Sequence, residues 1–106
     1  RSMQRLADAL REEPAGAHPD VAAMERATGH DRWTLFRQFR AAHGVSPYRF
    51  WTLRRLDRAR RMIASGQSLA EAAAAAGFTD QSHMSRQFKE TYGLPPGRWR
   101  RMLAAG

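Results

Sequence analysis

The sequence predicts an all-α fold of about seven helices, arranged as two helix-turn-helix subdomains joined by a long central helix. Apolar residues recur at helical spacing almost throughout the 106 residues, and no alternating pattern of strand type continues for more than a few residues. Glycines close most of the helical segments, and one pattern of residues occurs twice. We therefore expect residues 1–46 to form the first subdomain, 47–65 the connecting helix and 66–106 the second subdomain.

The starts of the predicted helices carry capping signals. A short polar side chain before a helix accepts a hydrogen bond from an otherwise unpaired backbone N–H. Ser68 followed by Glu71 forms a capping box, and Ser46 before Pro47 places a cap next to a proline in the first helical turn. The other signals are a first helix with Met3, Leu6, Ala7 and Leu10, a loop at 14–19, and further starts at Asp20, Asp31, Thr79 or Asp80, and Pro95–Pro96.

Three of the helices carry apolar stripes that we expect to be buried. Residues three or four apart share one face of a helix, so such a stripe marks the side that packs against the core. The expected buried sets are Leu35, Phe39 and Ala42 in the third helix; Met84, Phe88 and Thr91 or Tyr92 in the sixth; and Phe50, Leu53, Leu56, Ala59 and Ile63 in the central helix.

The chain contains an internal repeat. Arg37–Phe39 recurs as Arg86–Phe88, and a glycine follows each copy at the same distance, at Gly44 and Gly93. Further matches in the same order pair Gly29 with Gly77, Leu35 with Met84, Val45–Pro47 with Leu94–Pro96, and Arg49–Phe50 with Arg98–Trp99. Each copy therefore has a short helix, a glycine turn, a second helix and a closing glycine. This is the pattern of a helix-turn-helix, whose second helix enters a major groove of DNA.

The charge balance favours a polyanionic partner. The chain has 18 Lys and Arg against 10 Asp and Glu, for a net charge of +8, and Lys89 is the only lysine. Arginine suits phosphates and guanine edges because its planar fork donates two hydrogen bonds together. A solubilising surface, or a codon bias towards arginine, would give the same composition. The central helix alone carries Arg49, Arg54, Arg55, Arg58, Arg60 and Arg61 against Asp57; Arg55 is either a phosphate contact or a structural ion-pair residue.

Residues 77–89, with the sequence GFTDQSHMSRQFK, and then Tyr92–Pro96 closely resemble the signature of the AraC/XylS family of transcription regulators. The resemblance covers about residues 20–100. It implies two helix-turn-helix subdomains that bind successive major grooves of double-stranded promoter DNA. It also implies a separate ligand-sensing or dimerisation domain, which is not in this chain, and we expect RNA polymerase as a further partner. The residues that match outside the second signature are Gly29, Leu35, Arg37, Phe39, Gly44, Ser46–Pro47, Arg55–Leu56 and Ala59.

The outward faces of the third and sixth helices supply the candidate contacts to DNA. Arginine hydrogen-bonds guanine, glutamine hydrogen-bonds adenine, and apolar or aromatic groups meet thymine methyls. The expected base-reading residues are Arg32, Trp33, Phe36 and Arg37 in the first unit, and Gln81, Ser82, His83 and Arg86 in the second. The expected phosphate contacts are Arg40, Ser46, Arg49, Lys89 and Arg98, together with backbone amides at the starts of the fourth and seventh helices. For Trp33 and Phe36 the alternative is packing in the core.

Other classes of function find little support. The absence of cysteine excludes disulfides, thiolate zinc sites and cysteine nucleophiles, and the four histidines lack the spacing of metal ligands. We therefore expect no metal, no cofactor and no enzymatic activity. No apolar run approaches the roughly 20 residues of a membrane span, and no secretory signal is present, so we expect a cytoplasmic, nucleoid-associated protein without a membrane partner.

Three alternatives to sequence-specific regulation remain open. The first is a sequence-neutral, architectural DNA-binding protein, against which the base-reading side chains in both units argue. The second is the DNA-binding appendage of a repair alkyltransferase, whose nucleophilic cysteine would have to lie outside this chain. The third is a helical protein-interaction domain, which competition with excess non-specific DNA would separate from a DNA-binding one.

Binding to DNA is expected to depend strongly on salt. Neutralising about 6–10 phosphates releases counterions, so the affinity is expected to fall about 10³- to 10⁵-fold between about 50 and 200 mM salt. A fluorescence-anisotropy titration of a labelled duplex across this range measures the effect. An affinity that barely changes would contradict the prediction that the chain binds DNA.

Overall fold

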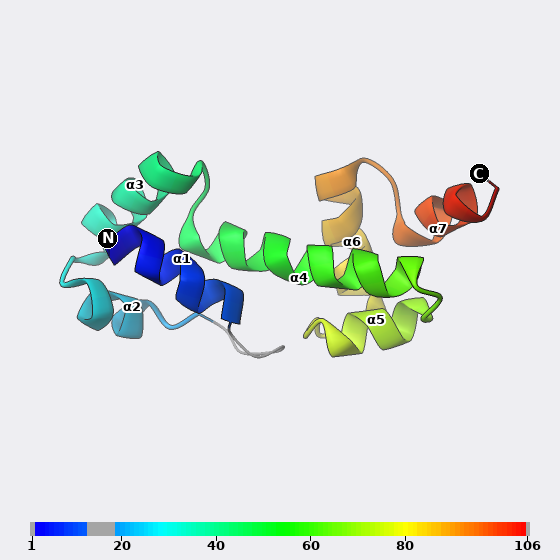
Figure 1. The fold of residues 1–106 in the computed structure, drawn as a ribbon, viewed down its shortest axis with the longest axis horizontal. Helices are drawn as coiled ribbons and strands as arrows, with labels where there is room; N and C mark the ends of the chain where they lie inside the picture. The colour runs from blue at the N-terminus through cyan, green and yellow to red at the C-terminus, as the bar shows by residue number, and fades with distance from the viewer. Residues whose placement is uncertain (1, 13–18, 106) are drawn as a thin grey trace. The chain divides into compact units, whose positions relative to one another are not determined.

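The computed structural model describes residues 2–12 and 19–105, and every regular element in these ranges is helical (Figure 1). The predicted all-α class and the prediction of about seven helices are confirmed. The predicted loop lies largely outside the described residues, because 13–18 are not described. Within the described ranges, no helix combines the length and the apolar character needed to cross a membrane. The helices are α1 (Ser2–Glu12), α2 (Val21–Thr28), α3 (Arg32–His43), α4 (Pro47–Ala64), α5 (Leu69–Ala75), α6 (Gln81–Tyr92) and α7 (Pro96–Ala105).

The chain divides into two compact units, Arg1–Arg54 (unit 1) and Arg55–Gly106 (unit 2). The boundary falls inside α4, so the first part of this helix packs with unit 1 and the rest with unit 2. The finer division with a separate connecting helix at 47–65 remains a prediction.

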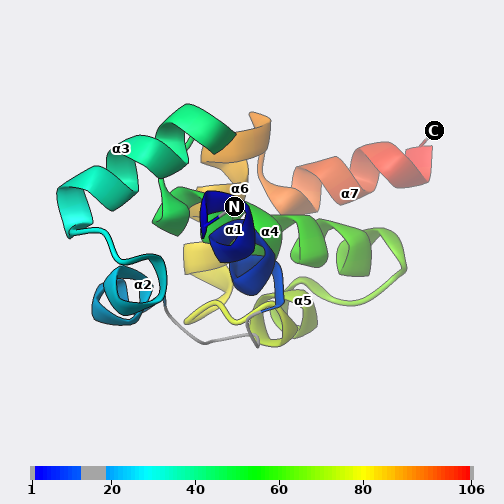
Figure 2. The same ribbon diagram turned by 60° about the vertical axis from the view of Figure 1, so that its left-hand side comes forward.

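Unit 1 is built on the apolar faces of α1, α2 and α3 and the start of α4. Figure 2 shows the short turn that joins α2 to α3. Leu35 and Phe39 of α3 have no exposed surface, and Trp51 of α4 is 2% exposed. Burying side chains of this size is the main source of stability for so small a unit. The complete cluster is Met3, Leu6, Ala7, Leu10, Met24, Leu35, Phe39 and Trp51.

Unit 2 has a core of the same kind, in which α5 contributes mainly alanines. Ala72 and Ala73 of α5 and the following Ala76 are buried, and they pack with Met84 and Phe88 of α6. Small side chains let the α5 backbone lie close to its neighbours. The complete cluster is Leu56, Ala59, Ile63, Ala72, Ala73, Ala76, Phe78, Met84 and Phe88.

The predicted caps are present. Asp20 accepts a hydrogen bond from the Ala22 backbone N–H at 3.0 Å, and Asp80 accepts one from the His83 N–H at 2.7 Å. The remaining starts behave as predicted: Asp31 accepts from the Thr34 N–H at 2.8 Å, Ser46 Oγ accepts from the Arg49 N–H at 3.1 Å, and Ser68 and Glu71 form both bonds of the capping box.

Two of the predicted buried stripes need correction. Ala42 is exposed, whereas the neighbouring His43 is half-buried, with its ring 4.5 Å from that of Phe39 one turn earlier. In α4, Phe50 and Leu53 are only half-buried, whereas Trp51 is almost completely buried in unit 1. The prediction assumed one continuous stripe along α4, but this helix packs into two different cores. Of the candidates at the end of α6, Thr91 and Tyr92 are both half-buried.

The internal repeat extends further than the matching tripeptide. Matching positions in α3 and α6 lie 49 residues apart, and the same offset relates α1 to the second part of α4. Asp8 and Arg11 form an ion pair at 3.0 Å, and their counterparts Asp57 and Arg60 form one at 2.7 Å. Unit 1 therefore repeats in unit 2 as three helices, although their buried side chains differ.

Each unit also contains a cluster of three aromatic rings at matching positions. In unit 1 the ring of Phe39 lies 4.5 Å from His43 and 5.5 Å from Phe50. In unit 2 the ring of Phe88 lies 4.6 Å from Tyr92 and 5.7 Å from Trp99. These contacts join the end of α3 to the start of α4, and the end of α6 to α7.

Candidate nucleic-acid interface

In each unit a tight turn joins the two helices of the helix-turn-helix, α2 and α3 in unit 1 and α5 and α6 in unit 2. Gly29 closes α2 with φ +74°, and its N–H donates to the Glu25 carbonyl at 2.8 Å. Gly77 occupies the matching turn of unit 2 with φ +85°. One additional residue follows it, because Phe78 and Thr79 separate Gly77 from the next cap where unit 1 has His30 alone. Side chains other than glycine rarely adopt this backbone region, so glycine at both turns lets the second helix leave sharply from the first.

The second helix of each helix-turn-helix, α3 or α6, is fixed through two buried residues one turn apart. Leu35 and Phe39 hold α3, and Met84 and Phe88 hold α6; all four are fully buried. A helix held along one stripe presents its opposite face to solvent, which is the arrangement that a recognition helix needs.

The outward faces of α3 and α6 carry most of the predicted contact residues at matching positions. Arg32, Trp33, Arg37 and Arg40 are exposed on α3, and Gln81, Ser82, Arg86 and Lys89 are exposed on α6. Each α6 residue lies 49 positions after its α3 counterpart. Within each unit, the structure therefore brings these candidate residues together on one free helix face.

Trp33 and Phe36 differ in exposure. Trp33 is 77% exposed, as expected for a residue outside the core. Phe36, which the sequence placed on the same exposed stripe, is half-buried and packs against the core of unit 1. Its position beside Leu35 at the edge of the buried stripe accounts for the difference. A contact of either ring with a base remains a prediction.

His83 is also less available than predicted. It lies in the first turn of α6, half-buried, with its ring 5.6 Å from that of Phe78 in an edge-on arrangement. Its buried Nδ1 has no hydrogen-bond partner among the described residues. Packing against Phe78 limits the reach of this ring, so Gln81 and Ser82 are the more accessible groups in the same turn.

The candidate phosphate contacts lie mostly beside the recognition helices. Arg40 and Lys89 are exposed near the ends of α3 and α6, and Arg98 is exposed in α7. Ser46 and Arg49 at the start of α4 are half-buried, and the Ser46 hydroxyl accepts the Arg49 N–H as a helix cap. That hydroxyl keeps its own proton free to donate to an anion.

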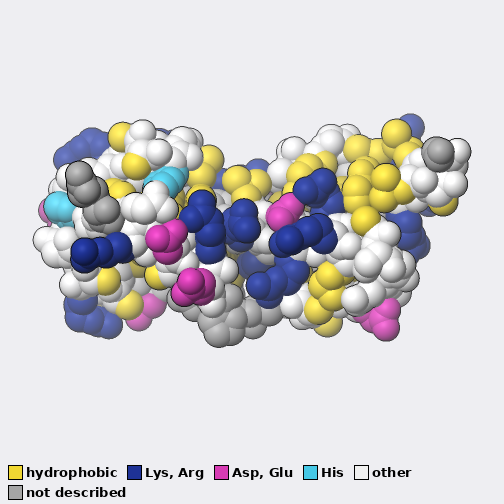
Figure 3. All heavy atoms as spheres, in the orientation of Figure 1, with side chains coloured by type: hydrophobic (Ala, Val, Ile, Leu, Met, Phe, Trp, Pro, Cys, Tyr) yellow, Lys and Arg dark blue, Asp and Glu magenta, His cyan; other side chains and the backbone are white. Residues whose placement is uncertain are grey.

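Electrostatics favour an anionic partner at these surfaces. Figure 3 shows dark blue Lys and Arg side chains over α4. Within this helix, Arg54, Arg58 and Arg61 are exposed. At the start of α3, hydrogen bonds from the backbone and side chain of Thr34 lower the pKa of Asp31, so this capping carboxylate stays ionised.

Among residues 2–12 and 19–105, no three His, Asp or Glu side chains group as metal ligands would.

The structure gives Arg55 a structural place in unit 2. This residue is 7% exposed, and its guanidinium donates hydrogen bonds to the carbonyls of Ala76 and Gly77. So little exposed surface disfavours a phosphate contact, and these two hydrogen bonds join Arg55 to carbonyls of the turn. The sequence alone did not identify this role, because nothing in the spacing of Arg55 and Ala76 brings them together.

Comparison with known proteins gives a consistent family. A family model described as a helix-turn-helix domain matches residues 24–102. A putative AraC-like transcription regulator from Streptomyces lividans is 34% identical over 83 residues, which cover 77% of this chain and 25% of that protein. The chain spans about a quarter of the length of the curated relatives that it matches.

Several solved structures share the fold. A probable AraC family transcriptional regulator from Rhodopseudomonas palustris superposes with a TM-score of 0.81 at 18% identity, covering 96% of both chains. The DNA-binding domain of AdpA in complex with a target DNA gives a TM-score of 0.74 at 23% identity, covering 98% of this chain and 90% of the other. At these identities the likeness establishes the fold.

Truncating Trp33 is expected to weaken DNA binding, whereas truncating Phe36 is expected to lower stability. Trp33→Ala removes an exposed ring, so the melting temperature stays nearly unchanged while specific DNA binding weakens. Phe36→Ala removes packing and lowers the free energy of unfolding by about 1–2 kcal/mol, in proportion to its partial burial. Thermal unfolding and binding to one duplex, measured on both variants, separate the two roles. A stability loss for Trp33→Ala equal to that for Phe36→Ala would contradict this assignment.

Proposed function

The chain belongs to the AraC-type family of helix-turn-helix domains, and on this premise we propose that it binds double-stranded promoter DNA in a sequence-specific manner. Each unit inserts its recognition helix, α3 or α6, into a major groove, and the two helices read successive grooves of one duplex. Binding of this kind places the chain in the control of transcription.

The observation that carries this proposal is the matching outward face of the two recognition helices. Both helices are held by two buried residues one turn apart, and both expose cations at two matching positions, Arg37/Arg86 and Arg40/Lys89. An amphipathic helix in a simple bundle needs a polar face but has no reason to carry its cations at the same positions as another helix. A net charge of +8 adds the electrostatic attraction that a DNA-binding surface needs.

Specific recognition divides between two kinds of contact. Arg49 near the start of α4 and Arg98 near the start of α7 occupy matching positions, where backbone amides and a guanidinium together can bind a phosphate. Such contacts fix the register of each recognition helix on the duplex. Arg37 and Arg86, at matching positions in α3 and α6, then reach guanine edges.

The two units are expected to prefer different bases. Arg32 and Trp33 in α3 correspond to Gln81 and Ser82 in α6. Glutamine and serine favour partners other than those of arginine and tryptophan, because their donors, acceptors and apolar surfaces differ. The target of one chain is therefore two dissimilar elements rather than a repeated one.

The whole protein is proposed to be a regulator in which this domain selects the binding site on DNA. The rest of such a protein would supply ligand sensing or dimerisation, and bound at a promoter it would meet RNA polymerase on nucleoid DNA. The domain acts by binding rather than by catalysis. The competing function is sequence-neutral, architectural binding, for which base substitutions would change the affinity little.

Replacing the two matching arginines one at a time tests the proposal. Arg86→Ala is expected to weaken binding by about 1–3 kcal/mol and to relax specificity at one base position only. Arg37→Ala is the matched control, which should relax specificity at a different position. Competition binding of each variant against single-base substitutions of the target measures both effects.

If either variant loses affinity equally for every sequence, its arginine binds phosphate rather than a base. If the unmodified chain itself discriminates between no sequences, the architectural function replaces the proposed one.

A further inference from the structure

We infer that Arg55 is a positioning residue for the second recognition helix: it holds the turn between α5 and α6 and thereby sets the base specificity of unit 2. This inference rests on the proposed function, since a defined position of α6 matters most if its side chains read bases. The observation behind it is a buried guanidinium from α4 that binds the turn of the helix-turn-helix directly.

Two hydrogen bonds and one ring contact of Arg55 lie at this turn. Its Nε donates to the carbonyl of Ala76 at 3.1 Å, and a terminal nitrogen donates to the carbonyl of Gly77. The guanidinium carbon lies 4.2 Å from the centre of the Phe78 ring, over its face. One side chain therefore touches three consecutive residues of the turn.

Arginine is suited to this place for three physical reasons. The last carbonyls of a helix have no partner within the helix, and a buried carbonyl without a hydrogen bond is costly. A cation is favourable at the negative end of the helix dipole. The guanidinium fork can bind two adjacent carbonyls and stack on a ring at once, which a lysine ammonium cannot do.

The turn passes its position to α6 through a short path. Phe78 is 6% exposed, and its ring packs edge-on against His83 in the first turn of α6. The cap residue Asp80 also binds the His83 N–H. A shift of Gly77 and Phe78 would therefore move the first turn of α6, which carries the candidate base-reading residues Gln81 and Ser82.

Unit 1 solves the same problem differently. Leu6 stands 49 residues before Arg55 and is equally buried, at 7% exposed, but it has no group that can bind the turn carbonyls. Instead, the Thr28 hydroxyl donates to the Met24 carbonyl at 2.8 Å and accepts the His30 N–H at 3.3 Å. The turn of unit 1 is thus held by a threonine of α2, the helix that leads into it.

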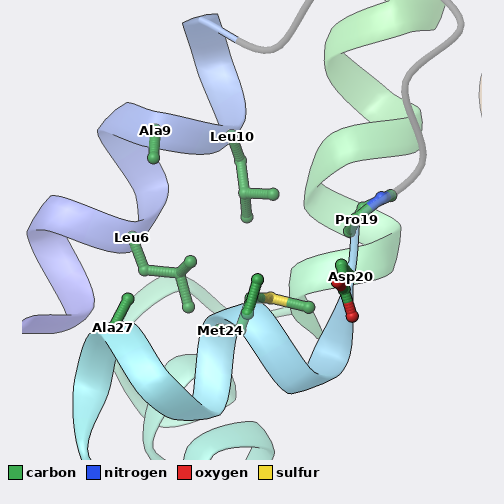
Figure 4. A pocket seen from close by; sticks show the side chains of 8 residues that line it. Leu6, Ala9, Leu10, Pro19, Asp20, Met24 and Ala27 are labelled. Carbon is green, nitrogen blue, oxygen red and sulfur yellow. The ribbon is translucent and has the colours of Figure 1, made fainter.

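Two hollows lie beside Leu6 in unit 1. Leu6 and Leu10 point from α1 towards Met24 of α2, beside a hollow of about 200 Å³ (Figure 4). A second hollow of about 180 Å³ borders Leu6 and Thr28. Leu6 lines both hollows, whereas its counterpart Arg55 contacts the turn of unit 2. The arginine therefore has a function specific to unit 2.

The test compares Arg55→Met and Arg55→Lys with Arg54→Met. Methionine keeps much of the length of the side chain without its donors, and lysine keeps the charge without the fork. Arg54 is the adjacent, exposed arginine of the same helix, so its replacement removes equal charge and leaves the turn intact. Affinities are measured for the selected target and its single-base substitutions, at a temperature at which circular dichroism shows each variant to be folded.

The expected result is specific to one unit. Arg55→Met should reduce discrimination at the bases read by unit 2 about 5- to 100-fold and leave discrimination at the bases read by unit 1 unchanged. Arg55→Lys should give a smaller loss at the same bases, and Arg54→Met no loss at either set. If Arg55→Met does not fold, Arg55→Lys carries the test, and full discrimination by that variant overturns the inference.

A uniform loss of affinity at all bases with discrimination kept, the result expected for Arg54→Met, would also overturn the inference. It would mean that Arg55 contributes only charge. A second readout separates this failure from failure of the proposed function. In the free protein, hydrogen exchange of the backbone amides at 81–84 should be faster in both Arg55 variants than in Arg54→Met. If the unmodified chain discriminates between no bases but these amides exchange faster, the proposed function fails while the positioning of α6 by Arg55 stands. Unchanged exchange overturns the positioning role itself.

Discussion

Burial of two side chains one turn apart on each recognition helix is the constraint on which the rest of the structure depends. Leu35 and Phe39 fix the facing of α3, and Met84 and Phe88 fix that of α6. A helix fixed in this way has one remaining free face, and every exposed candidate contact on α3 and α6 lies there. The aromatic cluster around each phenylalanine extends the constraint to the start of the next helix, where a second set of candidate contacts to phosphate lies.

The two units share this constraint and differ in how their turns are held. A threonine within α2 holds the turn of unit 1, and an arginine from α4 holds that of unit 2. A turn bound through several contacts from another helix has fewer accessible positions than one bound locally, which favours a defined readout by α6. The different outward residues of α3 and α6 point the same way, to two units with separate contributions to one target.

The sequence predicted the class of fold, the number of helices, their caps and the two helix-turn-helix units, because these depend on local spacing and on a repeat visible in the chain. Its errors arose where tertiary contacts decide. Ala42 was assigned to a buried stripe but is exposed, and Phe36, expected on the outward face with core packing as the alternative, is half-buried. The turn contacts of Arg55 join residues 21 and 22 positions apart and could not be derived from periodicity. Asp57 and Arg60 repeat Asp8 and Arg11 at an offset of 49 residues, so the sequence contained the signal for this second ion pair. It lies far from the matching tripeptide on which the repeat was recognised.

Selection of bound sequences from a random duplex pool tests the central claim, that two similar but unequal recognition helices read one duplex. The account predicts two enriched blocks of base pairs with different sequences, their centres about 10 base pairs apart, because successive major grooves on one face are one helical turn apart. Recovery of the pool without any enriched sequence, or with two copies of the same block, would contradict it.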